Sequence, residues 1–327
     1  MPATADAGSL TERLAVLDRL ADERGIALDH HALIGPLTTL RVGGTADRVA
    51  VAGSVAELVA GLELARVAGV PAGVLGKGSD IVVADAGIRG LVLRNRADAI
   101  AIDGSSVRAE SGAAMAALVK RCTVAGLGGM EFGISIPGSV GGAVWANAGA
   151  HGGEMKDAVV TVEAWSAGAG PQTLANAECA FAYRDSRFKE GGEIILAATL
   201  ALQPGETDAI AARVAAHQHQ RRATQPLADQ NAGSVFRNPI GDHAGRLIDV
   251  AGLKGHRIGS AEVSRKHANF IVVDRGGSAD DVRLLGDDVR TVVAERFGVT
   301  LEYEIEFVGD WGPGDRWATP TSALAAS

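Results

Sequence analysis

The 327-residue sequence has few cysteines, few aromatic residues and no long uncharged apolar run. Its two cysteines, Cys122 and Cys179, lie far apart and form no C-x-x-C pair, which excludes the common zinc and redox motifs. We expect two buried thiols in a reducing compartment and no metal site. The sequence lacks a signal-peptide pattern and any uncharged apolar run of about 18 residues, so we expect a cytoplasmic protein without membrane insertion.

Positive charge is also scarce. The formal net charge is −8, which disfavours nucleic acids and anionic membranes as partners. The hydrophobic content of 47% and the length allow two or three domains, each with its own core. Small-molecule partners, including phosphorylated ones bound by local basic groups, remain open.

Apolar periodicity predicts alternating strands and helices, which is typical of an α+β protein. Strands are expected at 47–53, 72–76, 80–85, 91–95, 99–103, 106–112, 158–167, 193–202, 269–274 and 301–309. Helices are expected near the N-terminus and at 54–69, 113–129, 206–226, 244–252 and 278–298. Ser54 with Glu57, and Ser278 with Asp281, have the spacing of helix N-caps, while Gly69 and Gly298 follow the helix ends. Short turns around 158–167 and 193–202 predict an antiparallel sheet.

Glycine is abundant and concentrated in three loops, at 41–47, 75–80 and 133–154. No charged residue lies between Gly133 and Glu154, apart from a single histidine. Glycines of this kind either mark tight turns or allow main-chain N–H groups to approach a phosphate. The Rossmann pattern is absent because Ile81 stands where its third glycine belongs, and Walker A is absent because Pro71 stands where its first glycine belongs. The length of the third loop favours an elongated ligand.

Seven motifs in order resemble one family, UDP-N-acetylenolpyruvoylglucosamine reductase (MurB). They are LGKGSDIVVADAGIRGLVL, EFGISIPGSVGGAVWANAGAHGGE, FAYRDSRFK, RRATQPL, NAGSVFRNP, AGLKGHRIGSAEVSRKHANFIV and LEYEIEFVG, spread over residues 38–309. The resemblance implies a two-lobed FAD-binding region of the vanillyl-alcohol-oxidase type, followed by a small α+β substrate-binding domain. The implied divisions are 1–95, 96–212 and 213–309, with a loose tail at 310–327. The short connection before RRATQPL resembles the compact subtype, which lacks a tyrosine-bearing substrate loop.

The resemblance also implies FAD, held non-covalently, and NADPH as co-substrate. Hydride would pass from NADPH through the flavin to the enolpyruvyl group of a UDP-sugar, giving UDP-N-acetylmuramate for peptidoglycan. A monomer or weak dimer is expected. The implied cofactor-binding residues are Gly76, Lys77, Gly78, Ser79, Asp80, Ile136, Pro137, Gly138, Ser139, Gly141, Gly142, Asn147, Ala148 and Gly149. Asp80 replaces the family's usual asparagine, and Arg237 replaces a usual lysine.

Three residues match the family's catalytic positions. Ser234 is implied as proton donor, Arg184 as the clamp of the substrate carboxylate, and Glu304 as a stabiliser of the intermediate. On pattern alone, Ser234 is equally a turn hydroxyl. The pattern favours Arg184 as a surface ion-pair partner of Asp185 or a neighbour, and Glu304 as a residue on the solvated face of a half-buried strand.

Substrate contacts are implied for Tyr183, Asn238, Lys254 and His267. A solvated lysine and a structural histidine are the alternatives for the last two. A second hypothesis on the same scaffold is an alcohol oxidase with a covalently attached flavin, for which His151 is the nearest candidate. A third is a nucleotide-binding module without chemistry.

Overall fold

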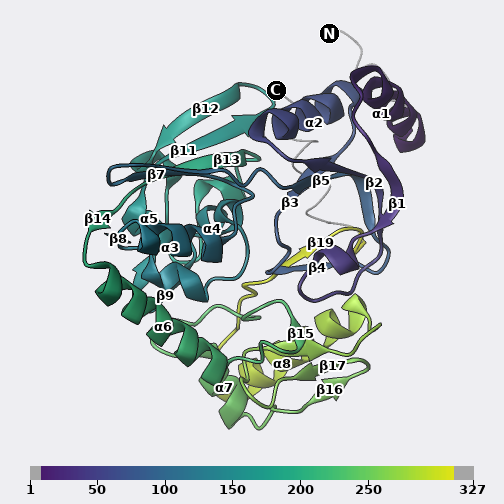
Figure 1. The fold of residues 1–327 in the computed structure, drawn as a ribbon. Coiled ribbons are helices and arrows are strands. Elements are labelled where there is room, and N and C mark those ends of the chain that lie inside the picture. The colour runs from purple at the N-terminus through teal and green to yellow at the C-terminus, as the bar shows by residue number, and fades with distance from the viewer. Residues whose placement is uncertain (1–8, 313–327) are drawn as a thin grey trace.

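The computed structural model describes residues 9–312, in which three larger sheets are packed with helices (Figure 1). Strands and helices alternate along the chain, as expected for an α+β fold. Residues 313–327, most of the predicted tail, lie outside the described residues.

The first sheet comes from the N-terminal part of the chain. Its order is β1 (Asp29–Leu33), β2 (Thr45–Ala52), β5 (Ile88–Asn95) and β3 (Ala72–Leu75), with β2, β5 and β3 parallel. Helices α1 (Leu10–Arg24) and α2 (Val55–Ala68) share an apolar core with it, and a 3₁₀ turn, η1, spans Gly35–Leu37. Ser54 Oγ accepts the Glu57 N–H and Gly69 ends α2 with a φ of 65°, so both predicted ends of this helix are confirmed.

The second sheet is antiparallel throughout. Its order is β12 (Gly170–Ala175), β11 (Val159–Ser166), β13 (Ile194–Ala201), β7 (Ser106–Glu110) and β6 (Ile100–Asp103). The predicted antiparallel pairing of 158–167 with 193–202 is thus confirmed as β11 with β13. Helices α3 (Met115–Val124), α4 (Val140–Trp145) and α5 (Met155–Ala158) contribute to its core. Both cysteines lie in this core as free thiols, and burial raises the pKa of each to about 11.

Short elements join these larger ones. Two small ladders pair β8 (Leu127–Gly128) with β14 (Gln203–Pro204) and β9 (Gly149–Ala150) with β10 (Gly153–Glu154). The 3₁₀ turns η2, η3 and η4 span Glu131–Ser135, Asn176–Cys179 and Arg187–Lys189.

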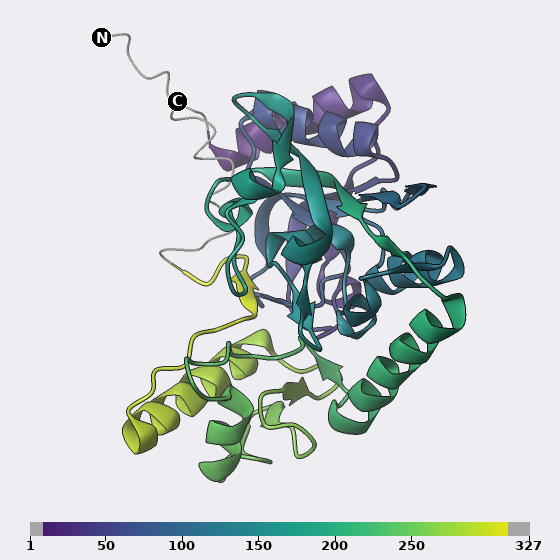
Figure 2. The ribbon, with the colours of Figure 1, turned by 90° about the vertical axis from the view of Figure 1, so that its left-hand side faces the viewer.

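Helix α6 (Thr207–Thr224) runs along the outside of the molecule and leads from the second sheet to the third (Figure 2). The third sheet has the order β15 (Gln230–Asn231), β18 (Ile271–Val273), β17 (Ala261–Val263) and β16 (Arg257–Ile258). It packs with α7 (Ala244–Val250) and α8 (Ala279–Phe297) around one apolar cluster. The predicted cap of α8 is present, since Ser278 Oγ accepts the Asp281 N–H, and Gly298 follows its end with a φ of 67°.

The expected strand at 301–309 differs from the structure. Only β19 (Glu306–Val308) is a strand, and it pairs in parallel with β4 (Ile81–Val83), which lies between β3 and β5 in the sequence. The residues just before β19 lie alongside the 235–237 segment, where the Glu304 N–H donates to the Val235 carbonyl at 2.8 Å. The chain therefore leaves the third sheet and returns to the N-terminal part of the molecule.

The three-part division expected from the sequence stays a prediction. The expected boundary after residue 95 falls at the end of β5, whereas that after residue 212 falls inside α6. The apolar cluster of the third sheet also includes Leu40, Val42 and Val82 of the N-terminal region. Apolar packing therefore joins the N-terminal region to the third sheet.

Candidate active site

A cavity of about 1850 Å³ lies where the three parts of the chain meet. Most single small-molecule sites occupy roughly 300–1,000 Å³, so this cavity has room for more than one large ligand. Its lining includes residues 73–81 and many residues within 135–151, 220–234 and 304–308. Thirteen of the fourteen predicted cofactor residues line it, all except Asn147.

The glycines of two loops allow those loops to touch one another. A Cβ on Gly76 would lie 2.5 Å from Ser139 Oγ, and one on Gly138 would lie 2.6 Å from Ser79 Oγ. Gly138 also has a φ of 106°, which side-chain-bearing residues rarely adopt. Loops 76–80 and 136–142 therefore form one continuous wall, a use of glycine that the sequence pattern did not reveal.

The same wall has main-chain donors that no protein group uses. Among residues 9–312, the N–H groups of Lys77, Gly78, Ser79, Gly138 and Ser139 donate to no described residue. Cavity-lining amides without acceptors, on loops with little charge, are suited to phosphate oxygens. These residues fit the diphosphate of a dinucleotide such as FAD.

Asn147 has a different place from its neighbours. It is fully buried, and its side-chain amide donates to the Ala182 carbonyl at 2.8 Å and accepts the Lys156 N–H at 2.9 Å. Because Ala182 lies two residues before Arg184, Asn147 ties the glycine-rich segment to the arginine's loop.

Arg184 and Glu304 form an ion pair on the cavity wall. Arg184 Nε donates to Glu304 Oε1 at 2.7 Å, and Nη2 donates to the Gly149 carbonyl at 2.8 Å. The φ of Arg184 is 55°, a strained value for a residue with a side chain. The alternative of a surface pair with Asp185 does not occur, since the guanidinium is directed at Glu304.

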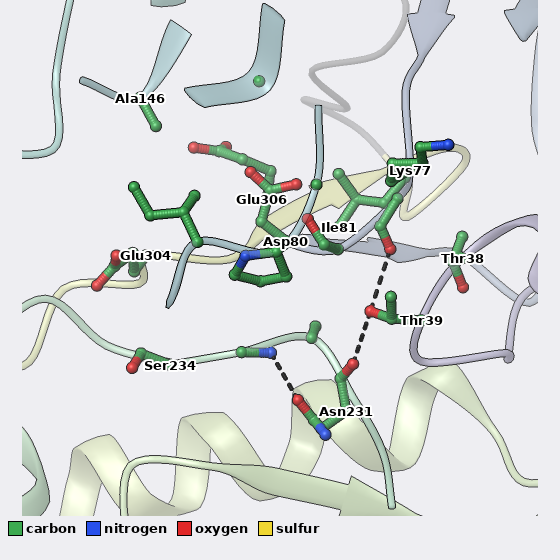
Figure 3. A pocket seen from close by; sticks show the side chains of 18 of the residues that line it. Thr38, Thr39, Lys77, Asp80, Ile81, Ala146, Asn231, Ser234, Glu304 and Glu306 are labelled. Carbon is green, nitrogen blue, oxygen red and sulfur yellow. Dashed lines mark hydrogen bonds between the residues drawn. The ribbon is translucent and has the colours of Figure 1, made fainter. Parts of the chain in front are cut away.

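Ser234 lies next to this pair. The Glu304 N–H donates to the carbonyl of Val235, the residue after the serine. The Ser234 hydroxyl lines the cavity and has no hydrogen-bond partner among residues 9–312, so it is available to a ligand. The Thr39 hydroxyl lies 2.8 Å from the Asn231 carbonyl oxygen and 3.3 Å from that of Gly78, which fixes this segment against the glycine loop (Figure 3).

The four predicted substrate residues lie outside the cavity lining. Tyr183 is exposed, and the Arg184 guanidinium lies 5.2 Å from the centre of its ring. Asn238 Oδ1 accepts the Ala244 N–H at the start of α7, and Lys254 pairs with Asp249 at 2.6 Å. Burial, together with the charge of Lys254, lowers the pKa of His267. Their substrate contacts stay predictions.

His151 belongs to a small cluster at the cavity edge. Its Nε2 lies 2.8 Å from Ser135 Oγ, and its ring stacks on that of His217 with centroids 3.9 Å apart. Burial and the charge of His217 lower the pKa of His151. Among residues 9–312, no group of three or more His, Cys, Asp or Glu side chains is arranged to hold a metal ion.

Two half-buried cationic residues of the cavity were not predicted. Lys189 Nζ lies 3.1 Å from Glu306 and 4.1 Å from the centre of the Trp145 ring, and its side chain is only 11% exposed. Burial lowers the pKa of Arg221, which pairs with no carboxylate among the described residues. Both lie within quoted motifs, FAYRDSRFK and RRATQPL, but nothing in the local pattern distinguishes them from solvated surface cations.

Comparison with known proteins identifies the scaffold. The family model for the FAD binding domain matches residues 46–172, and the model for the C-terminal domain of UDP-N-acetylenolpyruvoylglucosamine reductase matches residues 225–308. Together with the amide-lined cavity, these matches define a flavoprotein scaffold with an added C-terminal domain.

Whole-chain relatives narrow this to one family. UDP-N-acetylenolpyruvoylglucosamine reductase 2 of Symbiobacterium thermophilum is 45% identical over 84% of this chain and 91% of its own length. The reductase of Lactiplantibacillus plantarum is 41% identical over 90% of this chain and 97% of its own. The crystal structure of the Thermus caldophilus reductase (MurB) has a TM-score of 0.75 at 34% identity and covers 86% of this chain and 99% of that one. The chain belongs to the UDP-N-acetylenolpyruvoylglucosamine reductase family, which confirms the predicted fold class and disfavours the alcohol-oxidase alternative.

Proposed function

We propose that the protein catalyses the FAD-dependent, NADPH-driven reduction of UDP-N-acetylglucosamine enolpyruvate to UDP-N-acetylmuramate, a cytoplasmic step of peptidoglycan precursor synthesis. The family's name and the FAD-binding match support the activity. Ser234, Arg184 and Glu304, brought together on one wall of the cavity, are the observation that carries the proposal. No helix among residues 9–312 has the length and apolar character needed to cross a membrane.

Bound FAD would supply hydride transfer, accepting hydride from NADPH and delivering it to the methylene carbon of the enolpyruvyl group. Negative charge then develops on the neighbouring carbon and spreads into the substrate carboxylate. The protein must therefore place a cation at that carboxylate and a proton at that carbon.

Arg184 is suited to the first task. Its planar guanidinium matches a carboxylate, and its position is fixed by Glu304 on one side and the Gly149 carbonyl on the other. Glu304 keeps the guanidinium oriented before the substrate arrives and balances its charge. This pre-organisation lowers the cost of stabilising the developing anion.

Ser234 is suited to the second task. Its hydroxyl has no partner among the residues that the structure describes and can donate to the substrate carbon. A serine is a weak acid, so nearby positive charge from Arg184 helps it release its proton. We infer that NADPH and the sugar nucleotide use this region in turn, and that a monomer or weak dimer suffices, because one chain supplies all three groups.

Substituting Ser234→Ala separates the two half-reactions. In anaerobic stopped-flow measurements, reduction of the flavin by NADPH should proceed at the wild-type rate, because it needs no proton donor at the sugar. Reoxidation by the enolpyruvyl sugar nucleotide should slow by about 10²- to 10⁴-fold, the usual contribution of general acid catalysis.

Ser105→Ala, in the exposed turn between β6 and β7, is the matched control and should leave both rates unchanged. If Ser234→Ala reoxidised at the wild-type rate, Ser234 would not be the proton donor.

A further inference from the structure

Three carboxylates meet on one wall of the cavity. Asp80, at the end of the 75–80 glycine loop, lies with Glu304 and Glu306 in the lining (Figure 3). The Asp80 carbonyl accepts the Glu306 N–H at 2.8 Å, and Glu306 stands opposite Ile81 in the β19–β4 pairing. The pairing of β19 with β4 therefore brings the side chain of Asp80 close to two other acids.

The two cations beside these carboxylates form ion pairs with Glu304 and Glu306, and not with Asp80. Arg184 pairs with Glu304 at 2.7 Å, and Lys189 pairs with Glu306 at 3.1 Å. Asp80 forms no ion pair among residues 9–312, and Lys77 on the same loop is exposed. A half-buried carboxylate beside two others, without its own cation, keeps its proton to a higher pH than an isolated carboxylate does.

A protonated Asp80 changes what this wall can bind. An ionised carboxylate only accepts hydrogen bonds, and it would repel a diphosphate held on the neighbouring amides. A carboxylic acid carries a donor and is similar in shape to the asparagine amide that the family motif has here. The substitution is then compatible with a tightly bound anionic dinucleotide.

We propose that Asp80 acts as a neutral carboxylic acid that donates a hydrogen bond to bound FAD, so that FAD affinity falls as pH rises. The proposal rests on the proposed use of this cavity for FAD. Burial, then the charge of Glu306, raises the pKa of Asp80 to about 6; Glu304 adds to this rise and Lys189 opposes it. The Asp80 carboxyl therefore loses its proton within a pH range in which FAD binding can be measured.

FAD binding to the apoprotein tests this without any catalytic readout. FAD is titrated into apoprotein between pH 5.5 and 8, and the dissociation constant is followed by quenching of flavin fluorescence. Wild-type affinity should fall by up to about tenfold per pH unit above 6, since only the protonated form donates. Asp80→Asn keeps a donor at every pH and should bind FAD up to about 100-fold more tightly than wild type at pH 8.

Asp103→Asn is the matched control, because Asp103 is exposed at the end of β6 and does not line the cavity. It should follow the wild-type pH profile. A wild-type profile as flat as that of Asp80→Asn would overturn the proposal. If Asp80→Asn fails to fold, infrared spectroscopy of wild-type protein isotopically labelled at aspartate provides a second test. We expect a carboxylic acid band at pH 5 that disappears when the pH is raised to 8. The absence of this band at pH 5 would also overturn the proposal. Failure of wild-type protein to bind FAD at any pH would instead refute the proposed function.

Discussion

At the residue scale, glycine has two separable roles in the wall formed by loops 76–80 and 136–142. It allows a left-handed backbone conformation, and it allows two segments to approach each other closely. Gly78 and Gly104 have nearly the same φ, 58° and 56°, but different surroundings. A Cβ added to Gly78 would lie 2.9 Å from Thr38 Cα, whereas a Cβ added to Gly104 would have no neighbour within 4 Å. Comparing alanine substitutions at the two positions therefore separates the cost of backbone strain from the effect of the contact with Thr38.

Alanine at either position should destabilise the protein by about 1–2 kcal/mol, the cost of a left-handed conformation. Only Gly78→Ala should also weaken FAD binding, by about tenfold or more, because the loop must move away from Thr38 and lose a main-chain hydrogen bond to the phosphates. Titration of each apoprotein with FAD measures this. Equal affinities in the two variants would show that the close approach at Gly78 is unimportant.

Some residue-level features could be predicted from the sequence and others could not. Ser54 and Ser278 cap their helices as the spacing predicts, because capping depends only on neighbours along the chain. The partners of Arg184 and Lys189 are Glu304 and Glu306, far away in the sequence. No local pattern specifies such pairs, and only the resemblance to a family indicated the role of Arg184.

At the element scale, α8 is fixed to the first part of the chain by one side chain. Asp85, just after β4, accepts the Ser278 hydroxyl at 2.6 Å and the N–H groups of Ala279 and Asp280 at 2.9 and 3.2 Å. A carboxylate at a helix N-terminus satisfies unpaired amides and interacts favourably with the helix dipole. Helix α8 therefore depends on a cap supplied from a distant segment.

Asp85→Ala should lower the free energy of unfolding by about 1–2 kcal/mol, as for loss of an N-cap. Asp85→Asn should lower it less, since an amide oxygen still accepts hydrogen bonds but the charge is gone. Urea denaturation at pH 7 measures both. The exposed Asp103→Ala should change stability by less than about 0.5 kcal/mol, and an effect of that small size for Asp85→Ala would exclude the capping role.

The segment 301–309 shows where periodicity misleads. Alternating apolar and acidic residues predicted one strand within the closing block, but the apolar side chains pack in two places. Leu301 and Ile305 join the core of the third sheet, while Val308 joins that of the first. The alternation is satisfied by burial against two different layers, and this division depends on tertiary structure alone.

At the scale of the whole molecule, the return of β19 to β4 closes the cavity. It places Glu306 beside Asp80, at the end of the 75–80 glycine loop, and Glu304 beside Val235, the residue after Ser234. One covalent chain thus supplies the cavity-lining amides, the guanidinium, the hydroxyl and the acids of a single site. Composition and motif order indicated the parts of the site, but the pairing of β4 with β19, two segments far apart in the sequence, brings them together.

The measurement that tests this account most directly is the visible spectrum of the FAD-loaded protein during an anaerobic cycle. NADPH should bleach the flavin bands, and UDP-N-acetylglucosamine enolpyruvate, added once NADPH is consumed, should restore them in a single turnover with one equivalent of UDP-N-acetylmuramate formed. A protein that takes up no FAD, or whose bleached flavin is not reoxidised by the enolpyruvyl sugar nucleotide, would contradict it.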